Sequence, residues 1–231
     1  MITNIRKLKG FTLVELLIVS FISSIVIMGI LQLLSLNQNT SLLQKEMINV
    51  QNTGFFITSM ISNDLQKAGD FGEGTSKFDA IPFNFDKTLD NLDGNSQISI
   101  LYNNRENEFS CSGETGLTVI ENTYKVTDSK LYCNDIEIVD NVKRLKILYG
   151  ADINGDGSAD RYIDRDTAKI VSESSDQRIV SVMFALVLSS SRELEEKENK
   201  EIIILNNENL TFEDGRFYRI FYRNVTLNNM L

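Results

Sequence analysis

An uninterrupted apolar segment near the start of the chain limits the possible folds more than any other feature. Residues 11–36 are apolar apart from Glu15, Gln32 and small hydroxyl residues, and the 21 residues from Leu16 to Leu36 carry no charge. That length is sufficient for a helix to span the hydrocarbon region of a membrane. We therefore expect a membrane-spanning helix over residues 11–36. Glu15 needs an explanation, because a charge in such a segment is energetically costly.

Basic residues precede this segment. Arg6, Lys7 and Lys9 give the first ten residues a charge of +3, and the rest of the chain carries −12. The positive-inside rule places such a leader in the cytoplasm and the following domain across the membrane. A cleaved secretory signal is one alternative, but the apolar run is too long for it and no A-x-A-like site follows. An ordinary signal anchor is another, and it leaves Glu15 unexplained.

The composition argues against several classes of function. The chain contains no His, which disfavours catalytic triads and zinc sites and leaves carboxylate chemistry open. The acidic body does not suit a nucleic-acid backbone. The short cluster of Lys143, Arg144 and Lys146 is interpreted as a solvated strand face. We therefore expect no enzymatic activity, no organic cofactor and no direct nucleic-acid partner.

Helical spacing continues beyond the membrane segment, over residues 37–69. Apolar side chains recur there at intervals near one or two helical turns, among Asn, Gln, Ser, Lys and Glu. The positions are Leu36, Leu43, Met47, Val50, Ile57, Ile61, Leu65 and Ala68. One helix is predicted from about Phe11 to about Ala68, roughly 87 Å long at 1.5 Å per residue, and ended by Gly69, Gly72 and Gly74. Its first half must lie in the bilayer or in a helical bundle, and its amphipathic half is expected to pack on a globular head.

Residues 97–231 are predicted to form that head. Several strands after one long helix indicate an α+β fold with an antiparallel sheet. The strand-like segments are "QISILY", "RLKILYG", "RIVSVMFALVLS", "KEIIIL" and "GRFYRIFYRNVTL", of which the third is a continuous apolar run typical of a buried central strand. Residues 70–96 are predicted to be a loop region that aromatic side chains attach to the head: Phe71, Phe78, Phe83 and Phe85. The stretch "SSSRELEEKENK" is predicted to be a solvated loop.

The only two cysteines, Cys111 and Cys133, lie in the part of the chain expected outside the cytoplasm. An even count in an oxidising compartment predicts a disulfide. Closing that loop should stabilise the head by about 3 kcal/mol in the chain-entropy model. Two free buried thiols are the alternative.

The segment "YGADINGDGSADRYID" places oxygen-bearing side chains at alternate positions. Asp152, Asn154, Asp156 and Asp160, with the Ser158 carbonyl, have the spacing of a loop that surrounds a hard cation. The bidentate glutamate that ends an EF-hand loop is missing, and Asp164 is a possible substitute. These residues predict a structural calcium ion. The alternative is an Asn-Gly/Asp-Gly turn closed by Asx hydrogen bonds.

The residues "KGFTLVELLIVSF" resemble the class III signal of type IV pilins and pseudopilins. The resemblance implies that a prepilin peptidase cuts after Gly10, that the new terminus at Phe11 is N-methylated, and that Glu15 is the glutamate at the fifth mature position. Two departures from common patterns are relevant. Gln32 stands where many major pilins have a helix-bending proline, and Glu15 is present although some tip pseudopilins lack it.

Electrostatics supports a role for Glu15. Cleavage would create a positive α-amino group at Phe11, and a charge in hydrocarbon is tolerated when it is paired. One helical turn places Glu15 near its own Phe11, whereas the resemblance implies pairing with the amine of a subunit already in a filament. Glu15 would then set the assembly register. The alternative is an incidental polar residue in an anchor.

Three further stretches, in order along the chain, resemble the PilW family of minor pilins. They are "SNDLQKAGDFG" (residues 62–72), "LKILYGADINGDGSADRYI" (residues 145–163) and "GRFYRIFYRNVTLNN" (residues 215–229). The departures are Asp70, where an aromatic is usual, and Asn228-Asn229, where Arg-Asn is usual.

The resemblance implies the following function, partners and location. The chain would be a minor pilin that primes assembly of a type IVa pilus in complex with other minor pilins, and that contacts the major pilin, the prepilin peptidase and the inner-membrane assembly platform. It would be a single-pass inner-membrane protein with a periplasmic head, and later part of the pilus, at or near the tip. A type II secretion pseudopilin is the first alternative, and a surface enzyme or lectin on a pilin stem is the second.

Overall fold

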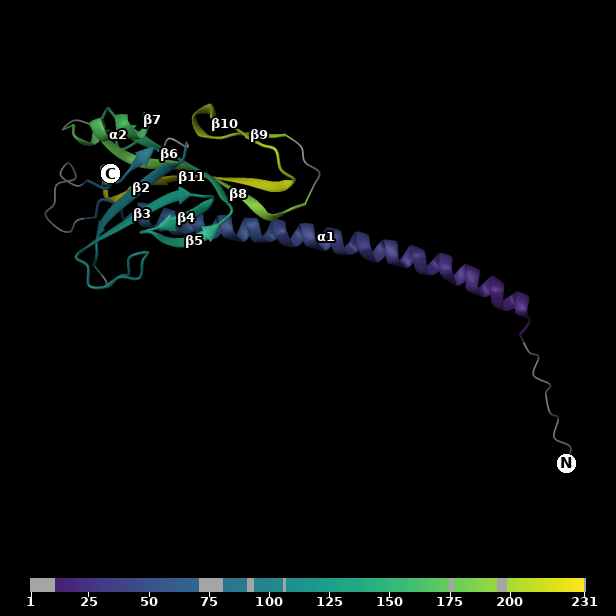
Figure 1. Ribbon diagram of the computed structural model, residues 1–231. Coiled ribbons are helices and arrows are strands. Elements are labelled where there is room, and N and C mark those ends of the chain that lie inside the picture. Colours follow the sequence, from purple (N-terminus) through teal and green to yellow (C-terminus); the bar gives the residue numbers. More distant parts are fainter. Residues whose placement is uncertain are drawn as a thin grey trace. The chain divides into compact units, whose positions relative to one another are not determined.

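The computed structural model describes residues 11–70, 81–90, 94–105, 107–174, 177–194 and 199–230. One long helix, α1 (Leu13–Lys67), precedes a set of antiparallel strands (Figure 1). The fold is therefore α+β, as the order of segments in the sequence predicts. The chain divides into two compact units, residues 1–45 and 46–231, which are described separately. The predicted leader, residues 1–10, lies outside the described residues.

Helix α1 has nearly the predicted bounds and is continuous through Gln32. Its end is marked by Gly69, whose φ of +76° lies in the left-handed region. A glycine reaches that conformation without a steric penalty, which makes it the usual residue just beyond a helix. The backbone N–H of Gly69 leaves the helical pattern and donates to the Leu101 carbonyl at 3.0 Å.

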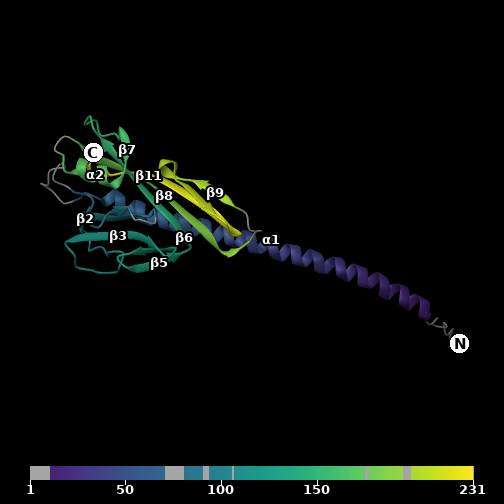
Figure 2. The same ribbon diagram turned by 45° about the horizontal axis from the view of Figure 1, so that its top comes forward.

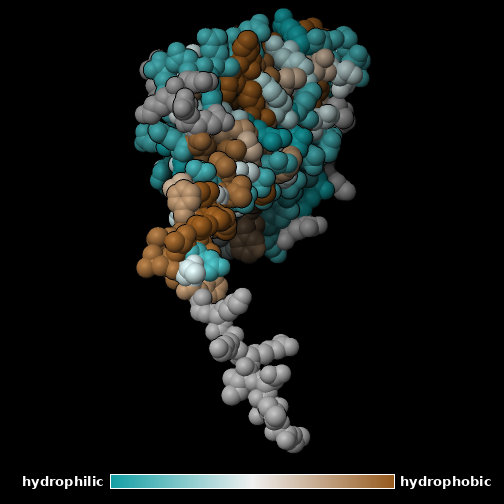
Figure 3. Space-filling view, turned by 90° about the vertical axis from the view of Figure 1, so that its right-hand side faces the viewer, coloured by the Kyte–Doolittle hydropathy of each residue, from teal (hydrophilic) through white to brown (hydrophobic). Residues whose placement is uncertain are grey.

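In the first unit, the hydrophobic side chains of α1 are exposed on all sides. Phe21 and Met28, for example, are 68% and 66% exposed, and Figure 3 shows hydrophobic side chains gathered along this segment. By length and composition α1 is long and apolar enough to cross a membrane, and no other helix among the described residues is. This agrees with the prediction of a spanning segment.

In the second unit, α1 buries one face in the head. Of the predicted apolar positions in this unit, Val50, Ile57, Ile61, Leu65 and Ala68 are buried and Met47 is half-buried. Gly54 lies on the same face, where an added Cβ would fall 2.1 Å from the Phe221 ring. Helix and strand therefore approach more closely there than any side chain at position 54 permits.

The strands form three antiparallel sheets rather than the single sheet predicted. The five-stranded sheet has the order β1-β2-β3-β4-β5, the four-stranded sheet β11-β8-β6-β7, and the third is the pair β10-β9 (Figures 1 and 2). The bounds are β1 (Leu89–Asp90), β2 (Ser96–Asn103), β3 (Val119–Thr127), β4 (Lys130–Cys133), β5 (Ile136–Asp140), β6 (Val142–Asp152), β7 (Arg161–Ile163), β8 (Arg178–Glu193), β9 (Lys200–Ile203), β10 (Asn209–Phe212) and β11 (Arg216–Thr226).

The continuous apolar run of β8 explains why the third sheet is needed. Phe184 and Leu186 belong to the main core, whereas Ala185 and Val187 form a second cluster with Ile204 and Leu210. Because successive side chains of a strand point to opposite faces, β8 is buried on both faces. The β9–β10 pair covers its second face, and Figure 2 shows β9 beside β8 and β11.

Three local features differ from the sequence-based expectations. A second helix, α2 (Arg165–Ser172), follows β7 and buries Ala168 and Val171. The predicted loop region 70–96 contains β1, while Phe83 and Phe85 are buried as expected; Phe71 and Phe78 lie outside the described residues. The first residues of "SSSRELEEKENK" continue β8 to Glu193, so the loop predicted there begins later.

Candidate functional site

Thr12 and Glu15 form a reciprocal pair at the start of α1. The carboxylate Oε2 of Glu15 accepts hydrogen bonds from the Thr12 backbone N–H and from the Thr12 hydroxyl, each at 3.3 Å. The Thr12 hydroxyl in turn accepts from the Glu15 backbone N–H at 3.3 Å. This is a capping box, in which a threonine before the first helical turn and a glutamate three residues later satisfy free N–H groups. The capping signal T-x-x-E is present in the sequence at residues 12–15, and this cap was not predicted.

The capping box leaves one carboxylate oxygen of Glu15 unoccupied. Both hydrogen bonds use Oε2, and Oε1 has no hydrogen bond among the described residues. Phe11, the predicted new terminus, is 80% exposed, and Gly10 lies outside the described residues. The geometry therefore places Glu15 at the amino end of the helix with one oxygen available for a cation.

A buried carboxylate, Asp64, fastens α1 to the five-stranded sheet. It accepts hydrogen bonds from the hydroxyl of Tyr124 at 2.6 Å, from Nδ2 of Asn122 at 2.8 Å and from the hydroxyl of Tyr102 at 3.3 Å. Asp64 is 9% exposed. Burial raises the pKa of Asp64 above its ordinary value, and the three hydrogen bonds with nearby Lys67 offset only part of that effect.

The Asp64 cluster explains the first family-like stretch. Asp64 lies inside "SNDLQKAGDFG", which the sequence analysis used only as a resemblance. Its spacing from Ile57, Ile61 and Ala68 places Asp64 on the apolar face of the helix, a local sign that was not used, but the spacing does not say what it contacts. Its partners come from β2 and β3, 38 to 60 residues away.

The predicted disulfide between Cys111 and Cys133 is present, with a Cα–Cα distance of 6.0 Å. Cys133 is fully buried in the main core. The backbone N–H of Cys111 donates to the Asn122 side chain at 2.9 Å, so the disulfide loop is connected to the Asp64 cluster. Cross-linking therefore restrains the part of the sheet on which α1 is anchored.

The aspartate loop lies between β6 and β7 and is closed by its own hydrogen bonds. Asp152, 1% exposed, accepts from the backbone N–H groups of Gly155 and Gly157 at 2.7 and 2.9 Å. It also pairs with Arg178 at 3.2 Å. Burial raises its pKa, but these amide bonds and Arg178 outweigh that effect and hold the pKa below its ordinary value.

The remaining predicted calcium ligands face the loop backbone. Asp156 accepts from the N–H of Ser158 at 2.7 Å, and Asp160 from the N–H of Ile153 at 2.7 Å. Asn154 bridges Asp156 and Asp160 through its Nδ2 at 3.2 and 3.1 Å. Asp164, the possible substitute ligand, caps α2 by accepting from the N–H of Thr167 at 2.8 Å.

The side chains of these residues offer oxygen atoms of the kind that calcium binds, but their oxygens are not arranged around a common centre. No group of three or more Asp, Glu, Cys or His side chains in the described ranges is arranged to hold a metal ion. Asp152, a required ligand, already faces a guanidinium. The geometry is that of the alternative, a turn closed by Asx hydrogen bonds, and calcium stays a prediction.

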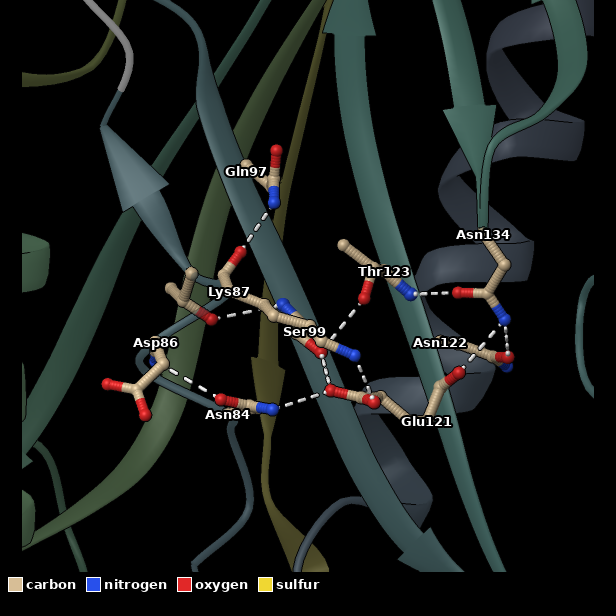
Figure 4. Close-up of polar contacts among 10 residues, drawn as sticks. Asn84, Asp86, Lys87, Gln97, Ser99, Glu121, Asn122, Thr123 and Asn134 are labelled. Carbon is tan, nitrogen blue, oxygen red and sulfur yellow. Dashed lines mark hydrogen bonds and ion pairs between the residues drawn. The ribbon is translucent and has the colours of Figure 1, made fainter. Parts of the chain in front are cut away.

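A polar groove of about 500 Å³ lies on the outer face of the five-stranded sheet. At its centre, the Glu121 carboxylate accepts from Asn84 at 2.7 Å, Lys87 at 2.6 Å and Ser99 at 2.8 Å (Figure 4). Burial raises the pKa of Glu121, but these donors together hold it below its ordinary value. With three donors engaged, Glu121 fastens the segment before β1 to β2 and β3.

Two family models match this chain, one near its start and one over most of the head. The family model described as type IV pilus-assembly protein W, PilW, matches residues 103–229, more than half of the chain. The chain belongs to the PilW family. The model of the prokaryotic N-terminal methylation motif matches residues 5–31, which include Gly10, Phe11 and Glu15.

This PilW-family chain is therefore a type IV pilin-like protein, and its family is structural rather than enzymatic. The methylation motif and the apolar helix suggest membrane anchoring before pilus assembly. Family membership implies interaction with other pilins and with the pilus machinery.

Among solved structures, a type IV-like pilin from Thermus thermophilus is similar to the chain at 10% sequence identity, with a TM-score of 0.45. The similarity covers 78% of this chain and 97% of that pilin. No curated protein sequence gave a significant match.

Proposed function

We propose that this PilW-family protein is a minor pilin that primes type IV pilus assembly in complex with other minor pilins, at or near the pilus tip. The observation that carries the proposal is the presence of two matches on one chain, the methylation motif at residues 5–31 and the PilW model at residues 103–229. In this role the protein supports twitching, adhesion or DNA uptake.

The proposed mechanism is one of assembly. A prepilin peptidase removes residues 1–10, and the new terminus at Phe11 is methylated. The helix stays in the inner membrane with the head in the periplasm until the assembly platform moves the subunit into the pilus. There the free Oε1 of Glu15 pairs with the α-amino group of a subunit already in place, which neutralises both charges in an apolar setting.

The Asp64 cluster supports this mechanism because it ties the helix to the head. Its three hydrogen bonds join α1 to β2 and β3. These bonds fix the part of α1 from Glu46 onward on the sheet, so the head presents one fixed set of surfaces to neighbouring subunits.

Deletion of the gene, followed by electron microscopy and immunoblotting of sheared surface pili, tests the proposal. A parallel strain in which retraction is also disabled is needed, because priming and stability against retraction are otherwise not separable. We expect pili to vanish in the first strain and to return in the second. Unchanged pili in both strains would rule out the priming role.

The second candidate is a minor pseudopilin of a type II secretion system, because the N-terminal motif is shared by both systems. Protein secretion measured in the same deletion strain separates the two. We expect secretion to be unaffected.

A further inference from the structure

A cleft of about 270 Å³ lies where α1 enters the head. Its walls are the first residues of the head part of α1, the end of β5, and β8. The polar residues that line it include Glu46, Asn49, Thr53, Asp140, Ser189 and Ser191. The volume is below the range of about 300–1,000 Å³ typical of small-molecule sites, so one inserted side chain suits it better than a cofactor.

Glu46 is the central charge of the cleft. It is only 8% exposed, and its Oε2 accepts from the backbone N–H of Ser191 at 3.1 Å and from the Ser191 hydroxyl at 2.8 Å. Its Oε1 has no hydrogen bond among the described residues. A buried carboxylate with no cationic partner is unfavourable, and no ion pair with Glu46 occurs in the described part of the chain.

Ser189 supplies an independent sign that the cleft is incomplete. Ser189 is 3% exposed, and its side-chain hydroxyl has no hydrogen-bond partner among the described residues. Buried hydroxyl groups in folded proteins are nearly always satisfied. Ser189 lines the same cleft as Glu46, so a buried hydroxyl without a hydrogen bond lies in the same cleft as a buried carboxylate that has no ion pair among the described residues.

The charge of the cleft defines the kind of group that completes it. Its two charged residues, Glu46 and Asp140, are both acidic. The nearby cation of the same chain, Arg216, is engaged with the Asn141 side chain at 3.2 Å and with Asp214 at 3.6 Å. A cation with several N–H donors is the kind of group that can hydrogen-bond both to a carboxylate and to a hydroxyl oxygen.

We propose that this cleft receives a basic side chain, lysine or arginine, from a neighbouring pilin subunit, held by Glu46, Ser189 and Asp140. The inference rests on the proposed function, because the neighbour is taken to be another pilin. Such a contact specifies which subunit sits beside the head, since a like charge or an apolar side chain in the same position is rejected.

Site-specific photo-crosslinking of the full-length protein in cells tests the proposal. A photoreactive residue replaces Thr53, which lines the cleft, and a control replaces Ile170, which is 70% exposed on α2. We expect the Thr53 position to capture a pilin-like chain at or next to a Lys or Arg. Capture at a segment without a basic residue, or no capture, would overturn the proposal.

Substitution of the cleft residues gives the second measurement. Glu46→Gln keeps the shape of the side chain and Ser189→Ala removes the unpaired hydroxyl. We expect Glu46→Gln to lower the crosslinking yield roughly tenfold or more. Exchanging the two charges, with Glu46→Lys in this chain and Glu in place of the captured basic residue in its neighbour, should restore the yield. Intact disulfide formation and protease resistance of each variant show that the head is folded. An unchanged yield in folded Glu46→Gln would contradict the proposal.

Surface pili counted in the same strains separate the two proposals. If pili depend on the gene but folded Glu46→Gln gives the normal number and the normal crosslink, the cleft proposal fails and the priming role stands. If pili do not depend on the gene, the priming role fails, and the identity of the crosslinked residue still decides the cleft proposal.

Discussion

The hydroxyl of Tyr124 donates a hydrogen bond of 2.6 Å to the carboxylate of Asp64 in the interior of the head. Tyr124 is fully buried on β3, and Asp64 lies on the buried face of α1. This contact joins α1 to β3, 60 residues later in the chain. It makes the orientation of the helix dependent on a polar group as well as on apolar packing.

Replacing Asp64 by Asn is expected to destabilise the head by about 1–3 kcal/mol. The amide oxygen can take the place of Oδ2 and accept from both Tyr124 and Asn122. The NH₂ group then takes the place of Oδ1 and faces the Tyr102 hydroxyl, which loses the acceptor of its hydrogen bond. Chemical denaturation measures the free energy of unfolding. Asp86→Asn, on a side chain that is 90% exposed, is the control and should change little. Equal stability of the two variants would contradict the role given to Asp64.

The pH dependence of stability provides a separate test of Asp64. Its pKa in the folded state is raised by burial, so protonation favours the folded form. The stabilisation is fully present below the ordinary Asp pKa of 3.8 and is lost as the pH rises through the folded-state pKa. We expect the free energy of unfolding of the native protein, minus that of Asp64→Asn, to fall as the pH rises. The subtraction removes the opposite trend from carboxylates with lowered pKa values, such as Asp152.

Glu15→Gln separates two roles for Glu15. Glutamine still forms a capping box with Thr12, but it carries no charge to pair with an amine. We expect Glu15→Gln to be lost from sheared pili, whereas Thr12→Val, which removes the hydroxyl bonds and keeps the charge, is incorporated. Incorporation is measured by immunoblotting against an equal amount in the membrane fraction. Normal incorporation of Glu15→Gln would reduce Glu15 to a helix cap.

Gly54→Ala is expected to destabilise the head by about 1–3 kcal/mol, although such a change in a helix interior usually stabilises by about 0.5–1 kcal/mol. The reason is the Phe221 ring, 2.1 Å from the new Cβ and restrained by an edge contact with Phe55 at 5.9 Å between centroids. Thermal unfolding of Gly54→Ala, Phe221→Leu and the double variant measures the coupling. If the two losses simply add, the clash is absent.

Calcium binding is tested most directly by thermal unfolding with millimolar calcium and with a chelator. A calcium site predicts a higher melting temperature with calcium, and Asp156→Ala abolishes the rise. A turn closed by Asx hydrogen bonds predicts equal melting temperatures. Arg178→Gln is a useful additional variant, because Asp152 must break its ion pair with Arg178 to bind a cation. If calcium raises the melting temperature more in this variant than in the native protein, Asp152 is a ligand.

Elements that depend on local pattern can be predicted from the amino-acid sequence. The bounds of α1, the apolar faces of its two halves and the buried strand β8 follow from hydrophobic spacing, which acts between residues a few positions apart. The disulfide follows from the expected compartment. The motif around Glu15 identified the assembly segment, and T-x-x-E also contained the helix cap, which needed only the capping rule to be seen.

The partners of the buried polar side chains, by contrast, depend on contacts between segments that are far apart in the chain. Asp64 meets Asn122, and Glu46 meets Ser191, across 58 and 145 residues of sequence, and no local period records such pairs. The division into three sheets has the same origin, because β8 needs cover on both faces and the chain must return to supply it. Hydrophobic spacing along the chain indicated α1 and the strands β2, β6, β8, β9 and β11, but not α2 or the remaining strands. Contacts between distant segments determined the burial of Asp64 and Glu46, since burial depends on what packs against a residue.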